Sequence, residues 1–350
     1  MAPHRVLLTG ANGYIASHIL SQLLSASHSV RAVVRSQSKV ESVRSLFPAS
    51  SSQLDFAIVP DMTAPGAFDT ALQSEPPFDV VLHTASPFLY KTAGSPSDFL
   101  EPAIKGTTEI LEGVKRVGNS VKRVVITGSF AGVGAFGLRD ESNKVYTEAD
   151  WNPVTEEDLE KAGDNFKGLS YLASKTFAER AAWDIVEKGG KDLGFDVVVL
   201  NPPMVYGPLK HKVKSVDELN ESTAQIYNKF IKDKKPEDSI PTNGLLPYVD
   251  VRDISKAHLL AIDTPEAANQ RFIITAGRLT NQKIADLLRE HVPGAAERVP
   301  KGDTGADTLP SDYYNIDNSK GLNVLGIKYR SAEETIGDLG KQLLEIEKGE

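Results

Sequence analysis

The 350-residue chain contains no cysteine. This absence excludes disulfide bonds, thiolate metal sites and cysteine nucleophiles. No apolar run approaches the roughly 20 residues that a membrane-spanning helix needs, and no basic and apolar leader precedes the first expected strand. Acidic residues outnumber basic ones, and the net charge of −8 argues against a nucleic-acid or anionic-membrane surface. We therefore expect a cytoplasmic protein that acts on a small molecule, with no metal site and no nucleic-acid or membrane partner.

Short apolar segments alternate with helical spacers along the chain. This alternation predicts a parallel sheet with helices on both faces, an α/β doubly wound fold of the Rossmann type with about seven strands. We expect a dinucleotide-binding domain in 1–203 plus 248–277, and a smaller, mainly C-terminal α/β substrate domain in 204–247 plus 278–350. The expected strands are Val6–Thr9, Val30–Val34, Phe56–Val59, Val80–His83, Val124–Thr127, Val197–Asn201 and Phe272–Thr275.

A glycine-rich turn follows the first strand. Gly10, Gly13 and Ala16 have the spacing G-x-x-G-x-x-A, and an amphipathic helix begins beyond them. Glycines let the backbone approach a pyrophosphate, and the N–H groups at a helix N-terminus point at the anion. The turn predicts a nucleotide site, while a turn chosen only for tight packing is the alternative.

Two basic residues follow the second strand, where an NAD site usually has an Asp or Glu that bonds the ribose hydroxyls. Here Arg35 takes that place, with Lys39 one helical turn later. A guanidinium binds a 2′-phosphate through two hydrogen bonds. The pair predicts NADP rather than NAD, and a solvated basic pair at a helix start is the alternative.

The residues after the third and fourth strands are also candidates, because ligands of such sheets bind beyond the carboxyl ends of the strands. Asp61 and Met62 suit an adenine, although an ordinary turn aspartate is an equal alternative. Residues 84–86 are small and leave room for a cofactor. His83 is expected to be structural, and Phe88 to face a substrate or simply to pack.

The fifth strand ends at Thr127 and is followed by Ser129, whose hydroxyl could reach a bound substrate. A loop serine that bonds its own backbone is the alternative. The next segment, 134–168, reads as a long irregular insertion that either forms one wall of a pocket or covers the surface.

Tyr171 and Lys175 lie four residues apart in a segment that reads as a helix, so they share one helical face. A neighbouring ammonium lowers the pKa of a phenol, which could then donate a proton near neutral pH. Spacing alone is not specific, because Tyr206 and Lys210 are also four apart. Between that second pair, however, lies the helix-breaking dipeptide 207–208.

The C-terminal part offers a charged pair and two helix caps. Arg252 and Asp253 could belong to an active site, but a structural salt bridge or a helix cap is the better interpretation. Thr280 is expected to cap one helix. Ser331 and Glu334 are expected to form a capping box for the last helix.

Together these motifs resemble the extended short-chain dehydrogenase/reductase superfamily over nearly the whole chain. Within it the chain resembles the dihydroflavonol reductase and cinnamoyl-CoA reductase group, and it is most similar there to the fungal NADPH-dependent methylglyoxal and isovaleraldehyde reductases, which are versatile carbonyl reductases. The segments that carry the resemblance are 9–16, 35–36, 83–87, 128–129, 171–175, 201–208 and 248–253.

The resemblance implies a catalytic group and a cofactor, NADPH/NADP+. Tyr171 would be the proton donor, Lys175 would hold the nicotinamide ribose and lower the pKa of the tyrosine, and Ser129 would bond the substrate carbonyl. The implied cofactor contacts are Gly10, Asn12, Gly13, Tyr14 and Ile15 at the pyrophosphate, Arg35 and Lys39 at the 2′-phosphate, Asp61 and Met62 at the adenine, Thr84, Ala85, Ser86 and Thr127 along the cofactor, and Pro202 and Val205 at the nicotinamide. The implied substrate pocket is formed by Phe88, Ser129, Phe130 and Tyr206.

Two positions depart from the pattern. Many members have Ser or Thr where this chain has Gly128, which affects the shape of the pocket. Many also have an Asn where this chain has Ala103, so a proton relay through that Asn is not expected.

We therefore expect an enzyme that reduces aldehydes or ketones with NADPH, as a monomer or homodimer. One alternative is an NAD(P)-dependent sugar-nucleotide epimerase or dehydratase, against which Arg35 counts. Another is a non-enzymatic dinucleotide sensor, a class that often loses the Tyr/Lys pair.

Overall fold

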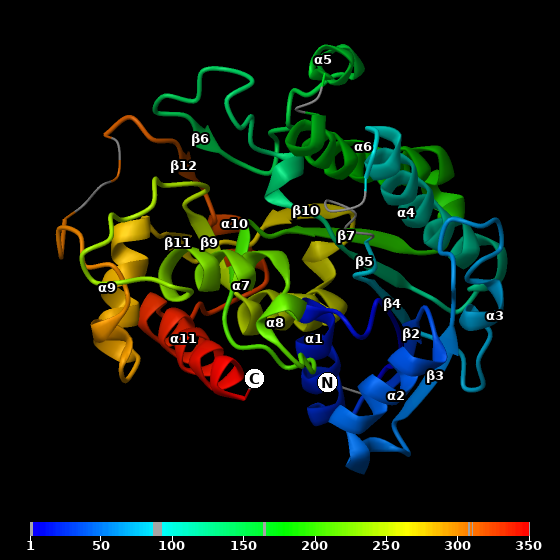
Figure 1. Cartoon of the computed structure of the whole chain (residues 1–350). Coiled ribbons are helices and arrows are strands. Elements are labelled where there is room, and N and C mark those ends of the chain that lie inside the picture. The colour runs from blue at the N-terminus through cyan, green and yellow to red at the C-terminus, as the bar shows by residue number, and fades with distance from the viewer. Residues whose placement is uncertain (1–2, 87–92, 164–165, 307–308, 310, 350) are drawn as a thin grey trace.

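The central feature of the computed structural model is a parallel sheet of seven strands in the order β10-β7-β5-β4-β1-β2-β3 (Figure 1). The structure describes residues 3–86, 93–163, 166–306, 309 and 311–349. Each expected strand overlaps an observed one, so the predicted doubly wound fold is confirmed. The strands are β1 (Arg5–Thr9), β2 (Ser29–Val34), β3 (Leu54–Ile58), β4 (Val80–His83), β5 (Arg123–Thr127), β7 (Asp196–Asn201) and β10 (Gln270–Ile273).

The direction in which successive strands are added to the sheet reverses at β1. From β1 the chain first builds β2 and β3 on one side, and then crosses to β4 and β5 on the other. In register, Thr9 at the end of β1 lies beside His83 at the end of β4. A crevice at such a reversal, beyond the carboxyl ends of the strands, is where doubly wound sheets bind their ligands.

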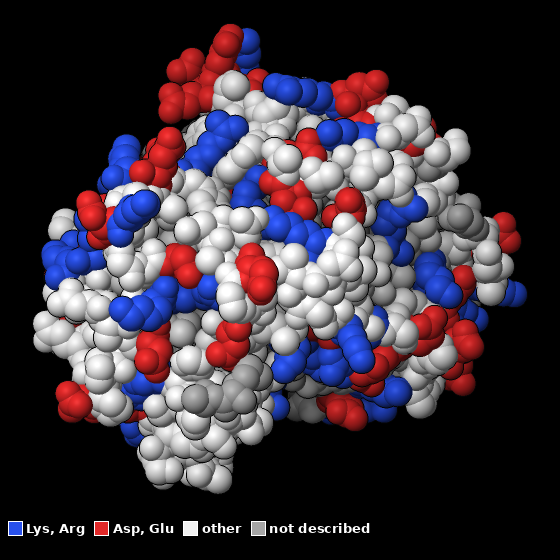
Figure 2. All heavy atoms as spheres, turned by 180° about the vertical axis from the view of Figure 1, so that it is seen from behind, with Lys and Arg blue, Asp and Glu red and all other residues white. Residues whose placement is uncertain are grey.

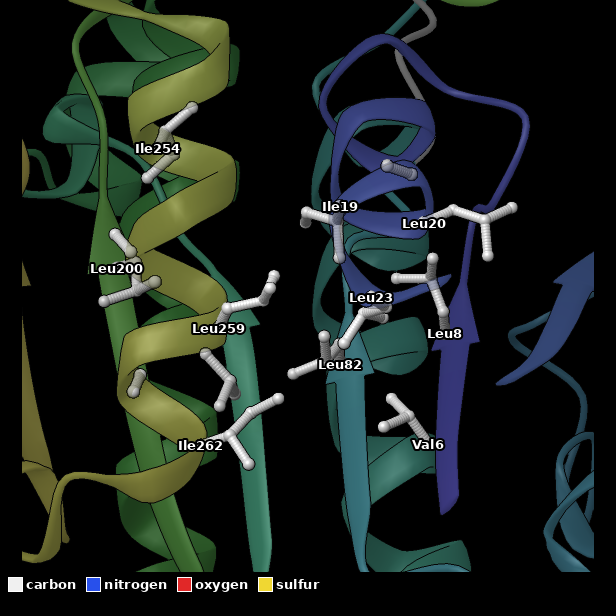
Figure 3. Close-up of a cluster of buried hydrophobic side chains, with 14 of the residues drawn as sticks. Val6, Leu8, Ile19, Leu20, Leu23, Leu82, Leu200, Ile254, Leu259 and Ile262 are labelled. Carbon is white, nitrogen blue, oxygen red and sulfur yellow. The ribbon is translucent and has the colours of Figure 1, made fainter. Parts of the chain in front are cut away.

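Helices cover both faces of the sheet, which explains why the strands are apolar on both sides. On one face, side chains of α1 and α8 pack on β1, β4 and β7, as Figure 3 shows for Ile19, Leu20 and Leu23 of α1 and for Ile254, Leu259 and Ile262 of α8. The helices of this face are α1 (Tyr14–Ser25), α2 (Gln37–Leu46) and α8 (Val251–Asp263). Those of the other face are α3 (Asp69–Leu72), α4 (Ser97–Val117) and α6 (Phe166–Gly189).

A second group of elements surrounds the small sheet β11-β9-β8. It has an apolar cluster of its own, in which Phe230, Leu288 and Leu339 are fully buried. Its elements are β8 (Met204–Tyr206), α7 (Glu221–Ile226), a π-helical turn (Tyr227–Ile231), β9 (Pro247–Asp250), β11 (Gly277–Arg278), α9 (Asn281–His291) and α11 (Ala332–Lys348). The short helix α10 (Ser319–Val324) packs instead on β10 of the large sheet.

The two expected caps differ in outcome. Thr280 caps α9, because its side chain accepts a hydrogen bond from Lys283 N. Ser331 accepts from Glu334 N, but the reciprocal half of the expected capping box is replaced by another bond. The Glu334 carboxylate instead accepts from Arg330 Nε at 3.0 Å. A charged donor outcompetes a backbone N–H for this carboxylate.

The acidic and basic residues at the start of α8 are structural, as the sequence predicts. Asp250 is the N-cap of α8 and forms an ion pair with Arg252 at 2.7 Å. Arg252 also pairs with Asp338, at 2.8 Å, while Asp253 pairs with Arg330. These pairs join α8 to α11 and to the segment before it.

The insertion at 134–168 contains regular structure, so the expectation of a wholly irregular segment is wrong. It holds β6 (Val145–Tyr146), which pairs with β12 (Asn315–Ile316), and the short helix α5 (Glu156–Lys161). Both the strand and the helix are too short to leave a periodic pattern in the sequence.

Acidic and basic side chains are interspersed over the face of the molecule that Figure 2 shows. Among the helices of the described residues, none combines the length and apolar character required to cross a membrane.

Candidate active site

The ends of β1 and β4 are fastened together at the crevice. Thr9 Oγ1 accepts hydrogen bonds from the backbone N–H groups of Thr84 and Ala85, each at 3.2 Å, and Thr84 Oγ1 donates to Thr9 O at 2.6 Å. Gly10 follows with φ at +66°, and a Cβ at this position would stand 2.9 Å from Ala85 Cα. Only glycine therefore lets the two backbones approach so closely.

Helix α1 begins at this turn without a side-chain cap, because its N-cap residue is Gly13. The first N–H groups of a helix have no partner within it, and they carry the positive end of the helix dipole. Tyr14 contributes only its backbone here, because its hydroxyl donates to Gly207 O at 2.6 Å. Asn12 and Ile15 flank the same turn and are half-buried. The turn is thus an uncapped cradle that fits a pyrophosphate.

Two cations without an ion-pair partner in the described part of the chain stand beside this cradle. Arg35, directly after β2, is exposed, and Lys39 lies in the first turn of α2. Burial lowers the pKa of His211, and the charge of Lys39 lowers it further. A basic pair at a helix N-terminus is unfavourable by itself. The pair therefore fits the extra phosphate of NADP.

Asp61 adopts the turn geometry that the sequence left open. Its Oδ1 accepts from Thr63 N at 2.9 Å and from Thr63 Oγ1 at 2.6 Å. These bonds lower the pKa of the Asp61 carboxyl. Met62 packs against Gly106 of α4, where a Cβ would collide with the thioether. The carboxylate thus forms the ordinary turn, and it remains exposed beside a half-buried methionine.

Tyr171, Lys175 and Ser129 come together at the carboxyl end of the sheet. Tyr171 and Lys175 lie one turn apart on α6, with Lys175 Nζ 5.6 Å from the centroid of the tyrosine ring. Ser129 follows β5 and lies within hydrogen-bond reach of the Tyr171 hydroxyl. Its Oγ also accepts from Ala131 N at 3.1 Å, which holds the side chain at the start of a short 3-10 helix, Phe130–Gly132.

Burial dominates the protonation of the two titratable groups. It raises the pKa of Tyr171, and the hydrogen bond with Ser129 opposes this shift. It lowers the pKa of Lys175 to about 8. Burial thus outweighs the groups that lower the pKa of Tyr171, and the expected lowering of this pKa by Lys175 stays a prediction.

Lys175 is anchored at its charged end. Its Nζ donates to Ser86 Oγ at 2.7 Å, which links α6 to the residues after β4. Tyr206 and Lys210 form no such pair. Tyr206 lies on β8, buried and stacked on Tyr248, whereas Lys210 is exposed beyond the turn.

Asn201 is the residue of this region whose role the sequence did not reveal. Its Oδ1 accepts from Ser129 N at 2.8 Å and occupies the space where a Cβ at Gly128 would collide with it. Its amide group donates to Glu179 at 3.3 Å and 3.4 Å. Glu179 in turn pairs with Arg271 at 2.6 Å. The available signal was the position of an amide directly at the end of β7.

Two residues expected to shape the substrate pocket are buried instead. Phe130 is 1% exposed and packs with Tyr146 and Tyr314, and Tyr206 is 6% exposed. They can therefore support the wall of a pocket from behind, and their part in a substrate pocket stays a prediction. Aromatic rings suit a pocket and a core equally well, so the sequence does not separate the two. Phe88 lies outside the described residues.

The remaining expected cofactor contacts lie at the ends of β5 and β7. Thr127 Oγ1 is bonded to His258 Nε2 of α8 at 2.7 Å, so its hydroxyl is committed to the core. Pro202 is buried, and its carbonyl accepts from Phe130 N at 2.9 Å. Val205, on β8, is 9% exposed.

Comparison with known proteins places this geometry in a family. The model of the NAD dependent epimerase/dehydratase family matches residues 6–277. The ketoreductase azaE of Aspergillus niger is 38% identical over 342 residues, which cover 97% of this chain and 98% of the relative. The NADPH-dependent methylglyoxal reductase GRE2 of Saccharomyces cerevisiae is 35% identical over 347 residues, which cover 98% of each chain.

A solved structure gives the same result. The yeast methylglyoxal/isovaleraldehyde reductase Gre2, complexed with NADPH, superposes with a TM-score of 0.89 at 35% identity, and the match covers 99% of this chain and 100% of that one. The chain therefore belongs to the NAD dependent epimerase/dehydratase family and is an extended short-chain dehydrogenase/reductase.

Proposed function

We propose that this protein is an NADPH-dependent carbonyl reductase that converts aldehydes or ketones to alcohols. The observation that carries the proposal is the grouping of Ser129, Tyr171 and Lys175 beside the uncapped glycine turn. The likeness over nearly the full length to an NADPH-dependent methylglyoxal reductase and to a ketoreductase supports it.

The cofactor is held along the crevice between β1 and β4. The glycine turn and the first N–H groups of α1 bind the pyrophosphate, and Arg35 with Lys39 binds the 2′-phosphate. Asp61 and Met62 flank the adenine, residues 84–86 line the path of the cofactor, and Pro202 and Val205 flank the nicotinamide. NADPH, when bound, supplies the hydride.

Side chains of the protein stabilise the negative charge that develops on the substrate carbonyl oxygen. As hydride reaches the carbonyl carbon, negative charge grows on the carbonyl oxygen, and the hydroxyls of Ser129 and Tyr171 donate hydrogen bonds to it. Tyr171 then transfers its proton to that oxygen. Because burial raises the pKa of Tyr171, the phenol is fully protonated before the reaction at neutral pH. Lys175 stabilises the phenolate that remains.

We also propose the two-domain division at 1–203 plus 248–277 and 204–247 plus 278–350. The separate apolar cluster around α7, α9 and α11 supports it. The protein is proposed to work in the cytoplasm as a monomer or homodimer. Light scattering and cell fractionation test these two statements.

The experiment for the main proposal is a screen of purified protein with NADPH against aldehydes, diketones, ketoesters and flavonoid ketones, followed by loss of NADPH absorbance. We expect stoichiometric formation of NADP+ and alcohol with at least one class. A sugar-nucleotide epimerase or dehydratase would instead retain its cofactor and turn over a nucleotide sugar without net oxidation. NADPH binding without turnover of any carbonyl would favour a dinucleotide sensor and contradict the proposal.

A further inference from the structure

A large cavity lies apart from the candidate active site. Its volume is about 730 Å³, which is within the range of small-molecule sites. One wall is formed by α1 and α8, which pack against each other (Figure 1), and the other by the segments 208–210 and 326–330. The described residues that line it include neither the catalytic group nor any expected cofactor contact. The cavity is therefore a separate candidate for a ligand site.

The two walls belong to different domains of the proposed division. Helices α1 and α8 lie in the dinucleotide-binding domain, whereas the two segments of the opposite wall lie in the substrate domain. Direct bonds fasten the walls together. His18 Nε2 of α1 donates to Pro208 O at 2.8 Å, and Asp253 of α8 forms an ion pair with Arg330. Ligands often bind where domains meet, and walls that are already fixed reduce the entropy cost of binding.

The cavity is basic, although the protein has a net charge of −8. Five of the thirteen described residues that line it are Lys or Arg, and one, Asp253, is a carboxylate. Asp253 is 1% exposed and is already paired with Arg330. Arg252 is paired in the same way with Asp250 and Asp338. The two arginines thus have carboxylate partners, and the charge of the other three basic residues is not neutralised by them.

The other three basic residues are Lys210, Lys256 and Lys328. They form no ion pair within the described part of the chain, and they come from three places around the cavity: the segment after β8, helix α8 and the segment before α11. Burial lowers the pKa of His18 to about 4, and the charge of Lys210 lowers it further. The positive potential therefore reaches the buried wall of the cavity. Like charges around one space repel each other, and an anion between them relieves the repulsion.

The arrangement of the lysines indicates the class of anion. Ammonium groups bind phosphate as point charges, and three of them around one cavity match a ligand with more than one charged group. Ser21 of α1 adds a hydroxyl to the lining, which can donate a further hydrogen bond. Leu209 and Leu260 add apolar surface on which the carbon part of a ligand can pack.

We propose that this cavity binds a small molecule with at least two phosphate groups, held between Lys210, Lys256 and Lys328. The site is distinct from the cradle of the cofactor, which lies at the N-terminus of α1, because the cavity is lined by the later turns of that helix. A ligand that contacts both walls joins the two domains. Its binding therefore stabilises the folded protein.

Calorimetric titration with inorganic tripolyphosphate tests the proposal. The protein is saturated with NADPH, so that the cofactor cradle is occupied. We expect one site per chain, with a dissociation constant between about 1 μM and 1 mM at low ionic strength. Orthophosphate should bind at least about tenfold more weakly, because one phosphate group cannot reach all three lysines at once. The affinity should fall as NaCl is added, and the unfolding temperature should rise with tripolyphosphate.

The double variant Lys256→Glu with Lys328→Glu removes the positive charge from two sides of the cavity. It should weaken tripolyphosphate binding by at least about tenfold, the effect of losing charged hydrogen bonds. Both side chains are exposed, so the variant is expected to fold, and circular dichroism checks this. The matched control is Lys188→Glu with Lys232→Glu, which makes the same change of net charge at exposed positions outside the cavity. The control should bind tripolyphosphate as the wild type does.

Three results would overturn the inference. They are absence of tripolyphosphate binding to the NADPH-saturated wild type, unchanged affinity in Lys256→Glu with Lys328→Glu, and an equal loss of affinity in the control variant. The last would mean that the anion responds only to net charge. Because the titration does not involve turnover, its result stands whether or not the protein reduces a carbonyl.

Discussion

At the scale of single residues, the preference for NADPH over NADH depends on two basic side chains that form no ion pair within the described residues. Arg35 and Lys39 have no ion pair among the described residues, although the chain carries 39 basic and 47 acidic residues overall. In a chain so rich in carboxylates, two uncompensated cations beside a helix N-terminus are consistent with an anion that arrives as ligand.

The variant Arg35→Asp tests this interpretation. It should weaken NADPH binding by about tenfold to a hundredfold, the range for loss of a charged hydrogen-bonded pair, because a carboxylate repels the 2′-phosphate. NADH binding should change little. Arg139→Asp makes the same change of charge at an exposed position elsewhere and is the control. Equal losses for both cofactors, measured by titration calorimetry, would show that Arg35 does not contact the phosphate.

The sequence was most informative where one residue type has one physical use. The uninterrupted apolar strands, the glycine turn and the Thr280 cap all follow from local chemistry, and the structure has them. Contacts between side chains that lie far apart in the sequence and meet only after folding could not be predicted from it. Asn201 accepts a hydrogen bond from Ser129 N, 72 residues away in the sequence, and fills the space beside Gly128. Phe130 packs in the core against Tyr314, which is likewise far away in the sequence.

At the scale of elements, the edge strand β10 holds the insertion in place. Arg271 of β10 pairs with Glu179 of α6, donates to the carbonyls of Glu148 and Asp150, and lies 3.6 Å from the Trp151 ring centroid. Glu148 itself accepts from the N–H of Ile273, which covers the open edge of the sheet. The same Glu179 reaches Asn201, so the edge is joined to the residues that hold Ser129.

Replacing Arg271 should therefore destabilise the protein strongly. Arg271→Met leaves Glu179 buried without its cation, and removal of one partner of a buried pair costs about 3–5 kcal/mol of unfolding free energy. Arg116→Met removes an exposed pair with Asp69 and should cost at most about 1 kcal/mol. Urea denaturation measures both. Similar losses for the two variants would contradict the structural role given to Arg271, and Arg271→Met combined with Glu179→Gln should recover part of the loss.

At the scale of the whole molecule, buried neutral histidines make stability depend on pH. Burial lowers the pKa of His18 and of His258 to about 4. The unfolded chain binds these protons near pH 6.5 and the folded chain does not, so the contribution is complete above about pH 6.5 and is lost as pH falls toward 4.

The variant His258→Gln isolates one of these groups. It should be less stable than the wild type at pH 7, because it loses the hydrogen bond to Thr127. The difference in unfolding free energy should shrink between about pH 6.5 and pH 4, since the variant has no proton to take up at this site. Unfolding in urea at a series of pH values gives the comparison. Parallel curves would mean that His258 is not held neutral by the fold.

The central claim is that Tyr171 donates the proton in a carbonyl reduction, and Tyr171→Phe tests it most directly. The change removes one hydroxyl and keeps the ring, so it should lower kcat by about 10²–10⁴-fold while the NADPH dissociation constant stays within about twofold. Tyr227→Phe, which removes a hydroxyl bonded to Glu347 of α11, should retain the wild-type kcat. Wild-type turnover by Tyr171→Phe, at unchanged affinity for NADPH, would contradict the account.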